Sequence, residues 1–98
     1  MPVSFRVKYH PDVKREDLPR IPPRDRETIR RAIEERLMTR PEAYGRPLRH
    51  TLRGYWKLRV GDYRIVFKVS GSEVHILAIV HRKEVYRIAA RRSIFRAE

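Results

Sequence analysis

The chain has 98 residues and no cysteine, and its 24 lysines and arginines against 12 acidic residues give a formal net charge of +12. The lack of cysteine excludes disulfides and thiolate metal sites, and the longest apolar run, Ile76 to Val80, is too short to span a membrane. We therefore expect a single domain over residues 1–98 that is cytoplasmic, has no membrane contact and binds a polyanion, of which nucleic acid is the commonest.

The first segment predicts a strand and a short helix. Apolar and polar residues alternate from Val3 to Tyr9, which is the period of a strand with one buried face. Residues 12–18 can form a short helix that turns Val13 and Leu18 inward.

The next segment predicts a longer amphipathic helix. It should begin near Pro23, because proline is favoured at the first helical position. Apolar residues then recur about every four positions and form one stripe on a charged helix. Pro41 should end this helix, and residues 42–50 read as a loop. The stripe consists of Ile29, Ala32, Ile33 and Leu37.

The centre of the chain predicts a β-hairpin. Two alternating runs, 56–60 and 63–69, flank the dipeptide Gly61-Asp62, which suits a two-residue turn. This turn pairs Arg59 with Arg64, an unfavourable contact between like charges. Two interpretations remain open: the arginines point apart into water, or they form an anion site. One face of the hairpin is an apolar ladder, and the other carries Lys57, Arg59, Arg64 and Lys68.

The last segment predicts a strand and a helix. Residues 73–81 are apolar on both faces, with Val74, Ile76, Ala78 and Val80 on one and Leu77 and Ile79 on the other. A strand of this kind is covered on both sides, and an amphipathic helix that starts near Val85 and reaches Phe95 is the candidate cover. The expected fold is α+β: an antiparallel sheet of about four strands with an N-terminal helical hairpin and a C-terminal helix.

The motifs within these elements resemble those of the RelE/ParE superfamily of toxins, which are encoded beside small antitoxins. They are Leu52-Arg53-Gly54 before the hairpin, Val60-Gly61-Asp62-Tyr63-Arg64-Ile65 in it, and His81-Arg82-Lys83-Glu84-Val85-Tyr86 after the last strand. The resemblance implies the order strand, two helices, three strands, helix. RelE-like members are endoribonucleases that cut messenger RNA on the ribosome, whereas ParE-like members poison DNA gyrase.

The resemblance also implies a site. The basic hairpin residues of the RelE branch fall on Lys57 and Arg64, its arginine after the last strand on Arg82, and its tyrosine on Tyr86. One position departs from the pattern, because Tyr55 stands where some members are basic, and Arg59 on the same face can supply that charge. Four cations nearby are candidates for RNA binding: Arg53, Arg59, Lys68 and Lys83.

The residue types suit RNA cleavage without a metal, which needs a base for the 2′-hydroxyl and cations for the developing negative charge. A nest of cations favours the phenolate of Tyr86, which then acts as the base, and His81 is an alternative proton carrier. Two structural alternatives stay open: Tyr86 packs on the sheet, and Arg82 pairs with Glu84 or Asp62. The histidine spacing predicts no metal, and we expect no cofactor.

The sequence therefore predicts the toxin of a type II toxin–antitoxin system, acting as a ribosome-dependent endoribonuclease on mRNA. Its expected partners are an acidic antitoxin, in a hetero-oligomer, and the ribosome with its message. A gyrase inhibitor of the ParE type and a non-catalytic RNA-binding module are the alternatives.

Overall fold

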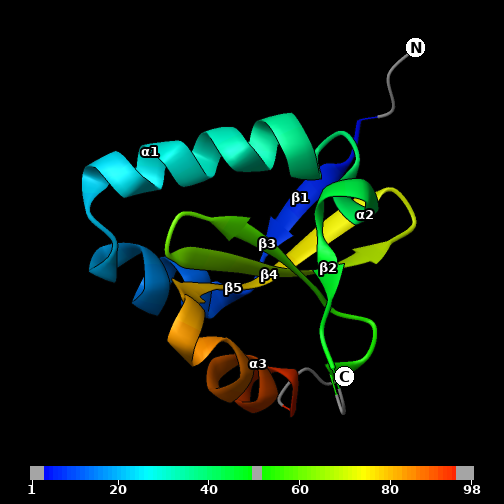
Figure 1. Cartoon of the computed structure of the whole chain (residues 1–98). Coiled ribbons are helices and arrows are strands. Elements are labelled where there is room, and N and C mark those ends of the chain that lie inside the picture. Colours follow the sequence, from blue (N-terminus) through cyan, green and yellow to red (C-terminus); the bar gives the residue numbers. More distant parts are fainter. Residues whose placement is uncertain (1–3, 50–51, 95–98) are drawn as a thin grey trace.

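A five-stranded sheet forms the centre of the molecule, with helices on both of its faces (Figure 1). The computed structural model describes residues 4–49 and 52–94, so the predicted positions of Val3, His50 and Phe95 lie outside the described residues. The strands are β1 (Arg6–Tyr9), β2 (Arg46–Pro47), β3 (Trp56–Val60), β4 (Tyr63–Ser70) and β5 (Glu73–His81). Between and after them come the helical elements η1 (Val13–Asp17), η2 (Leu18–Arg20), α1 (Pro23–Ala32), η3 (Ile33–Leu37), α2 (Pro41–Tyr44), η5 (Arg82–Glu84) and α3 (Val85–Ile94).

The strand order is β1-β5-β4-β3-β2, and β1 runs parallel to β5. The α+β class is confirmed, and the sheet is antiparallel except that β1 joins it in parallel; the strand beyond the predicted four is the two-residue edge strand β2. The helical segment after β1 crosses one face of the sheet, so β3 runs in the same direction as β1. β4 is antiparallel to β3, and β5 is antiparallel to β4, so β5 pairs with β1 in parallel. As a result the most apolar strand lies between two neighbours.

The central hairpin forms as the sequence predicts. β3 and β4 pair with Val60 opposite Tyr63, Arg59 opposite Arg64 and Trp56 opposite Phe67. Gly61 adopts φ 59°, the left-handed conformation that a two-residue turn requires at this position. The ladder of alternate residues on one face packs beneath α1 and η3.

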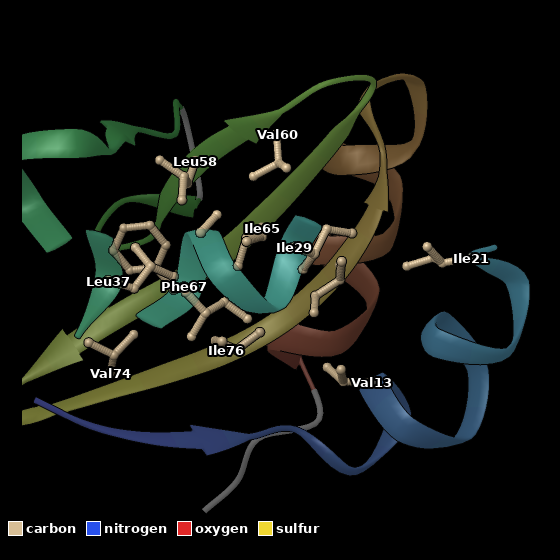
Figure 2. Packing of buried hydrophobic residues seen from close by; sticks show 13 residues of the cluster. Val13, Ile21, Ile29, Leu37, Leu58, Val60, Ile65, Phe67, Val74 and Ile76 are labelled. Carbon is tan, nitrogen blue, oxygen red and sulfur yellow. The ribbon is translucent and has the colours of Figure 1, made fainter. Parts of the chain in front are cut away.

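That side of the sheet holds the larger core. Ile29 of α1 and Leu37 of η3 lie against Ile65 and Phe67 of β4, and all four side chains are almost fully buried (Figure 2). The predicted stripe on the long helix is confirmed, and so is its start at Pro23. Val13 of η1 is also buried in this core, and Leu18 is partly buried beside it.

A β-bulge in β5 changes which side chains share a face. Val66 pairs with Ala78, whereas the next residue, Phe67, pairs with Ile76, so Leu77 is an extra residue. An extra residue reverses the alternation beyond it. Val74, Ile76 and Ile79 therefore join the core under α1, while Leu77, Ala78 and Val80 face the other side. The predicted division of this strand into two faces is wrong on that account.

The C-terminal helix covers the second face, as predicted. Val85, Ile88 and Ala89 of α3 are buried against Ala78 and Val80 of β5 and their neighbours. In Figure 1, α1 and α3 lie on opposite sides of the sheet. α3 packs mainly on β5 and reaches β4, and its Tyr86 lies beside Lys57 of β3.

Residues 42–50, predicted as a loop, contain the short helix α2 and the edge strand β2 in their described part. Arg46 pairs with Lys57, and Pro47 with Trp56. Proline is tolerated here because the strand lies at an edge. Gly45 is required just before β2, since a Cβ atom there would lie 2.7 Å from Cζ of Phe67.

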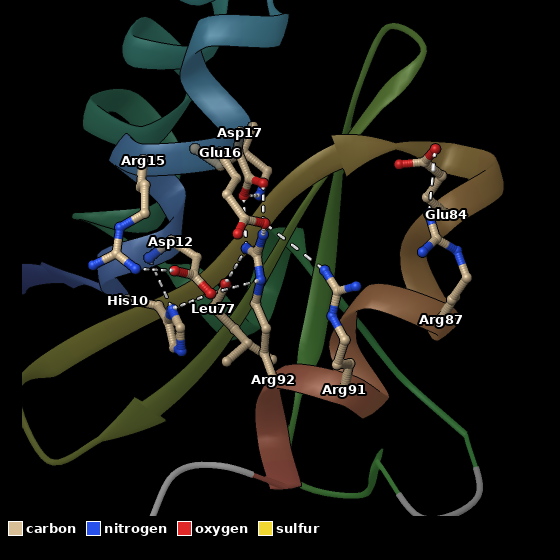
Figure 3. Close-up of polar contacts among 11 residues, drawn as sticks. His10, Asp12, Arg15, Glu16, Asp17, Leu77, Glu84, Arg87, Arg91 and Arg92 are labelled. Carbon is tan, nitrogen blue, oxygen red and sulfur yellow. Dashed lines mark hydrogen bonds and ion pairs between the residues drawn. The ribbon is translucent and has the colours of Figure 1, made fainter.

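Arg92 of α3 is buried, although in the sequence it looks like a charged residue that interrupts the apolar face of the helix. Its guanidinium forms a double ion pair with Asp17 of η1, with Nη1–Oδ2 and Nη2–Oδ1 both 2.8 Å (Figure 3). Arg92 Nη1 also donates to the carbonyl of Leu77, and Asp17 Oδ2 accepts from the amide of Ile79. The pair thus satisfies β5 backbone groups beyond the end of β1 and joins α3 to the N-terminal segment.

Within residues 4–49 and 52–94, no helix has the length and apolar character needed to cross a membrane.

Candidate active site on the basic face of the sheet

Three predicted site residues lie on the face of the hairpin that is on the same side of the sheet as α3. Lys57 pairs with Val66, whose side chain is buried under α3, so Lys57 projects from the same side of the sheet. Arg59 follows two residues later and pairs with Arg64, which therefore shares that side. Two residues along a strand span about 6.8 Å, so Lys57, Arg59 and Arg64 form one continuous group of cations.

Tyr86, at the start of α3, lies beside Lys57 at one end of this group. The Lys57 Nζ atom lies 5.5 Å from the centroid of the Tyr86 ring, and Cζ of Arg49 lies 6.0 Å from the same centroid. The Tyr86 hydroxyl is buried, and within the described residues no hydrogen bond of good geometry reaches it. The phenol is therefore held between two cations, one from β3 and one from the segment after β2.

These two cations change the acidity of the phenol. Burial alone would raise the pKa of Tyr86, but the hydrogen-bonding groups and positive charges of Arg49 and Lys57 outweigh it and lower the pKa below its ordinary value. A lowered pKa increases the phenolate fraction near neutral pH. Tyr86 is thus better suited to accept a proton than an isolated tyrosine.

Arg64 bends towards the hairpin turn. Its Nη1 donates to the carbonyls of Gly61, at 3.1 Å, and Tyr63, at 2.9 Å. Partial burial and the nearby charges of Arg59 and Arg82 lower the pKa of Arg64. Even lowered, a guanidinium pKa keeps the group charged near neutral pH, so repulsion among these arginines is relieved when an anion binds between them.

Arg82 is brought to the same end of the hairpin by its backbone, because its amide donates to the carbonyl of Asp62 at 2.9 Å. Its side chain is exposed. Among the described residues Arg82 forms no ion pair, and Glu84 pairs instead with Arg87, at 3.5 Å. The side-chain ion pair that the sequence left open for Arg82 is therefore not formed.

His81 lies on the other face of the sheet. It pairs with Tyr63 across β4 and β5, and the two rings meet edge to face with centroids 6.4 Å apart. Its Nδ1 accepts a hydrogen bond from the amide of Lys83. The bulge at Leu77 causes this placement, which separates His81 from Lys57 and Arg64 and also from His75. This placement does not favour His81 as the alternative proton carrier, a role that stays a prediction.

The other predicted RNA-binding residues are exposed but dispersed. Lys68 of β4 lies on the same face as Lys57, with its Nζ 5.6 Å from the centroid of the Tyr55 ring. Arg53 lies in the turn that precedes β3, and Lys83 lies in η5 beside Arg82. Their roles in binding remain predictions.

Sequence reasoning missed two residues of this site, Arg49 and the ring of Tyr55. Arg49 falls in a segment with no periodic pattern, and only the pairing of β2 with β3 brings it near Tyr86. The sequence placed Tyr55 on the basic face with Lys57 and Arg59, since odd-numbered residues of this strand share a side, but it gave the ring no part in the site.

Within residues 4–49 and 52–94, no three His, Asp or Glu side chains gather as a metal site would require. The prediction of a metal-independent reaction rests on the residue chemistry and stays a prediction.

The comparison with known proteins now identifies the fold and its family. Residues 7–86 match the model of the family described as "ParE toxin of type II toxin-antitoxin system, parDE". The chain belongs to the RelE/ParE family of type II toxins. This confirms the resemblance seen in the sequence motifs.

Individual relatives of this RelE/ParE-family chain are toxins from Mycobacterium tuberculosis. Toxin RelG is 33% identical over 87 residues, which cover 87% of this chain and 99% of the relative. Toxin RelE is 31% identical over 80 residues, covering 82% and 75%. A solved structure of the RelBE2 toxin–antitoxin complex from the same organism matches with a TM-score of 0.75 at 30% identity, covering 82% of this chain and 93% of that one.

Proposed function

We propose that this toxin is a metal-independent endoribonuclease that cuts mRNA on the ribosome. The observation that carries the proposal is the half-buried ring of Tyr86, held between Lys57 and Arg49 at the edge of the cations that continue through Arg59 and Arg64. A phenol with a lowered pKa beside several phosphate-binding groups is what metal-free RNA cleavage needs.

The chemistry follows from these positions. The Tyr86 phenolate takes the proton of a ribose 2′-hydroxyl, whose oxygen attacks the adjacent phosphorus, and the bond from phosphorus to the 5′-oxygen breaks. The leaving 5′-oxygen takes a proton from water, and Tyr86 returns its proton to solvent, so the products are a 2′,3′-cyclic phosphate and a 5′-hydroxyl. Lys57, Arg64 and Arg82 hold the phosphate and stabilise the additional negative charge of the transition state.

The partners follow from charge. An acidic antitoxin segment can neutralise the basic face, and we propose that it inhibits the toxin by covering Lys57 and Tyr86 within a hetero-oligomer. The match to the toxin of a toxin–antitoxin complex supports a partner of this kind. Ribosome and message are in the cytoplasm, where we place the reaction.

Two substitutions test the reaction. Arg82→Ala removes one electrostatic stabiliser and should slow message cleavage roughly 10²- to 10³-fold. Tyr86→Phe removes the base and should slow cleavage by roughly 10²-fold or more. Cleavage is measured on programmed ribosomes with end-labelled mRNA.

Arg24→Ala is the matched control, because it removes one exposed positive charge from α1, on the opposite face of the sheet. It should leave cleavage unchanged. Wild-type rates in both Arg82→Ala and Tyr86→Phe would overturn the proposed site.

A gyrase poison is the second candidate, and the ParE name of the matching family model favours it. Expression in growing cells separates the two functions. Cleaved message without double-stranded DNA breaks supports the nuclease, whereas DNA breaks with intact message identify a gyrase poison.

A further inference from the structure

A second row of side chains crosses the basic face at right angles to the strands. Lys8 of β1 is opposite His75 of β5, and His75 is opposite Lys68 of β4. Since Trp56 pairs with Phe67, the residues before and after them, Tyr55 and Lys68, are neighbours on this face. We call Lys8, His75, Lys68 and Tyr55 the transverse row.

The transverse row lines a depression of about 310 Å³, which also contacts Leu77 of the bulge. Glu73 is the acid beside the row, pairing with His75 at 3.0 Å and with Lys8 at 3.9 Å. In the described part of the chain, Lys68 has no ion-pair partner. Lys68 lies between Tyr55 and His75 and not opposite an acid, so its ammonium is available to an anion.

Tyr55 gives the row an aromatic ring, with one face packed against the protein and the other face accessible. Its ring packs against the core cluster beneath α3. The ammonium of the exposed Lys68 lies over the ring at 5.6 Å, so a mobile side chain occupies the accessible face. A nucleobase can displace a lysine from such a position, because every base has a π-face that stacks on an aromatic ring. The released ammonium is then available to a phosphate.

The transverse row adjoins the cleavage site. Tyr55 and Lys57 lie on the same face of the same strand, two residues or about 6.8 Å apart, and Lys57 is beside Tyr86. We infer that the transverse row is a nucleotide subsite. Tyr55 stacks on the base next to the scissile phosphate, and Lys68 holds the next phosphate outward. This assignment rests on the proposed function only for the position of the scissile phosphate.

The test measures binding rather than cleavage. Two short single-stranded RNAs carry 2′-O-methyl groups, so neither can be cut, and one has an abasic residue at the position beside the blocked cleavage point. Tyr55→Ala should weaken binding of the complete RNA roughly 5- to 150-fold, the range of one aromatic–base stack. It should leave binding of the abasic RNA nearly unchanged.

Two variants complete the design. Tyr55→Phe keeps the ring and should bind both RNAs as the parent does, which separates stacking from loss of fold. Lys68→Ala should weaken the complete RNA more than the abasic RNA, because only a stacked base displaces the ammonium from the Tyr55 ring and frees it for a phosphate. Circular dichroism checks that each variant is folded.

Equal weakening of both RNAs by Tyr55→Ala would overturn the subsite. Unchanged RNA binding, with weaker binding of an oligoglutamate peptide, would show a protein-binding surface instead and would also overturn it. This result can be told apart from that of the nuclease test. If Tyr86→Phe still binds the complete RNA more tightly than the abasic RNA, the subsite is supported whether or not RNA is cut. If the parent cuts RNA but binds both RNAs equally, only the nuclease proposal is supported.

Discussion

Tyr86 combines two properties at the scale of a single residue: its hydroxyl is buried, and two cations face its ring. Burial opposes ionisation and the cations favour it, so the acidity of the phenol depends on which effect is larger. Here the charges prevail. The reactivity of Tyr86 is therefore a property of Arg49 and Lys57 as much as of the tyrosine itself.

Replacing Arg49 with alanine should raise the pKa of Tyr86, because a positive charge that stabilises the phenolate is lost. The measurement is the titration of phenolate absorbance near 295 nm, with the Tyr86→Phe protein subtracted to isolate this one tyrosine. Cleavage by Arg49→Ala should be slower than the parent near neutral pH and should recover part of the difference as pH rises. A titration curve identical to that of the parent would contradict the role of Arg49.

The positions of single residues were predictable where a local pattern carries them. The hairpin register placed Lys57 and Arg64 on one face, and Arg82 and Tyr86 stand in the motif that follows the last strand; their roles stay predictions. The burial of Arg92 was not predictable, because its partner Asp17 is 75 positions away. The position of Arg49 depends in the same way on the pairing of β2 with β3, which no periodic pattern in the sequence predicts.

At the scale of elements, β5 contributes side chains to the hydrophobic cores on both faces of the sheet. Alternation along this strand is a reliable guide only as far as the bulge, after which one extra residue reverses it. The sequence predicted a strand covered on both sides, which is correct. The bulge has no marker such as a glycine, so the side chains assigned to each face, and with them His81, were misplaced.

α3 is held on β5 by an apolar face and by the ion pair between Arg92 and Asp17. Breaking only one partner leaves a buried charge without compensation, so Arg92→Met should lower the free energy of unfolding by about 3–5 kcal/mol. The loss should appear as a lower urea midpoint with an unchanged slope. Asp17→Asn combined with Arg92→Met should be less destabilised than the sum of the two single variants.

Arg30→Met is the control, since Arg30 pairs with Glu27 and Glu34 on the exposed surface of α1. Exposed pairs contribute little to stability, and the urea midpoint should barely move. Equal midpoints for Arg92→Met and Arg30→Met would show that the buried pair does not secure α3.

For the whole molecule, the distribution of acidic residues matters more than the net charge of +12. On α1 and η3, arginines alternate with acids and form ion pairs such as Arg30 with Glu27 and Glu34. On the basic face, Asp62, Glu73 and Glu84 lie only at the ends of strands or in the turns that follow. One side of the sheet is thus neutralised internally, and the other remains available to a polyanion.

This asymmetry predicts how RNA binding responds to salt. Each phosphate contact contributes about −0.7 to the slope of log K against log salt concentration for single strands. Arg59→Ala should make the slope shallower by roughly that amount, whereas Arg24→Ala, on α1, should leave it unchanged. Filter binding of a single-stranded RNA across a salt series measures both slopes, and equal slopes would show that binding is spread over the whole surface.

The parallel pairing of β1 with β5 has a consequence for synthesis of the chain. Residues 6–9 leave the ribosome early, but their hydrogen-bonding partners at 73–76 are made only after the hairpin. Until then β1 has no strand to join, and the charges of Arg6 and Lys8 should disfavour its pairing with other chains. The toxin therefore closes its sheet late, by inserting its last-made strand between two older ones.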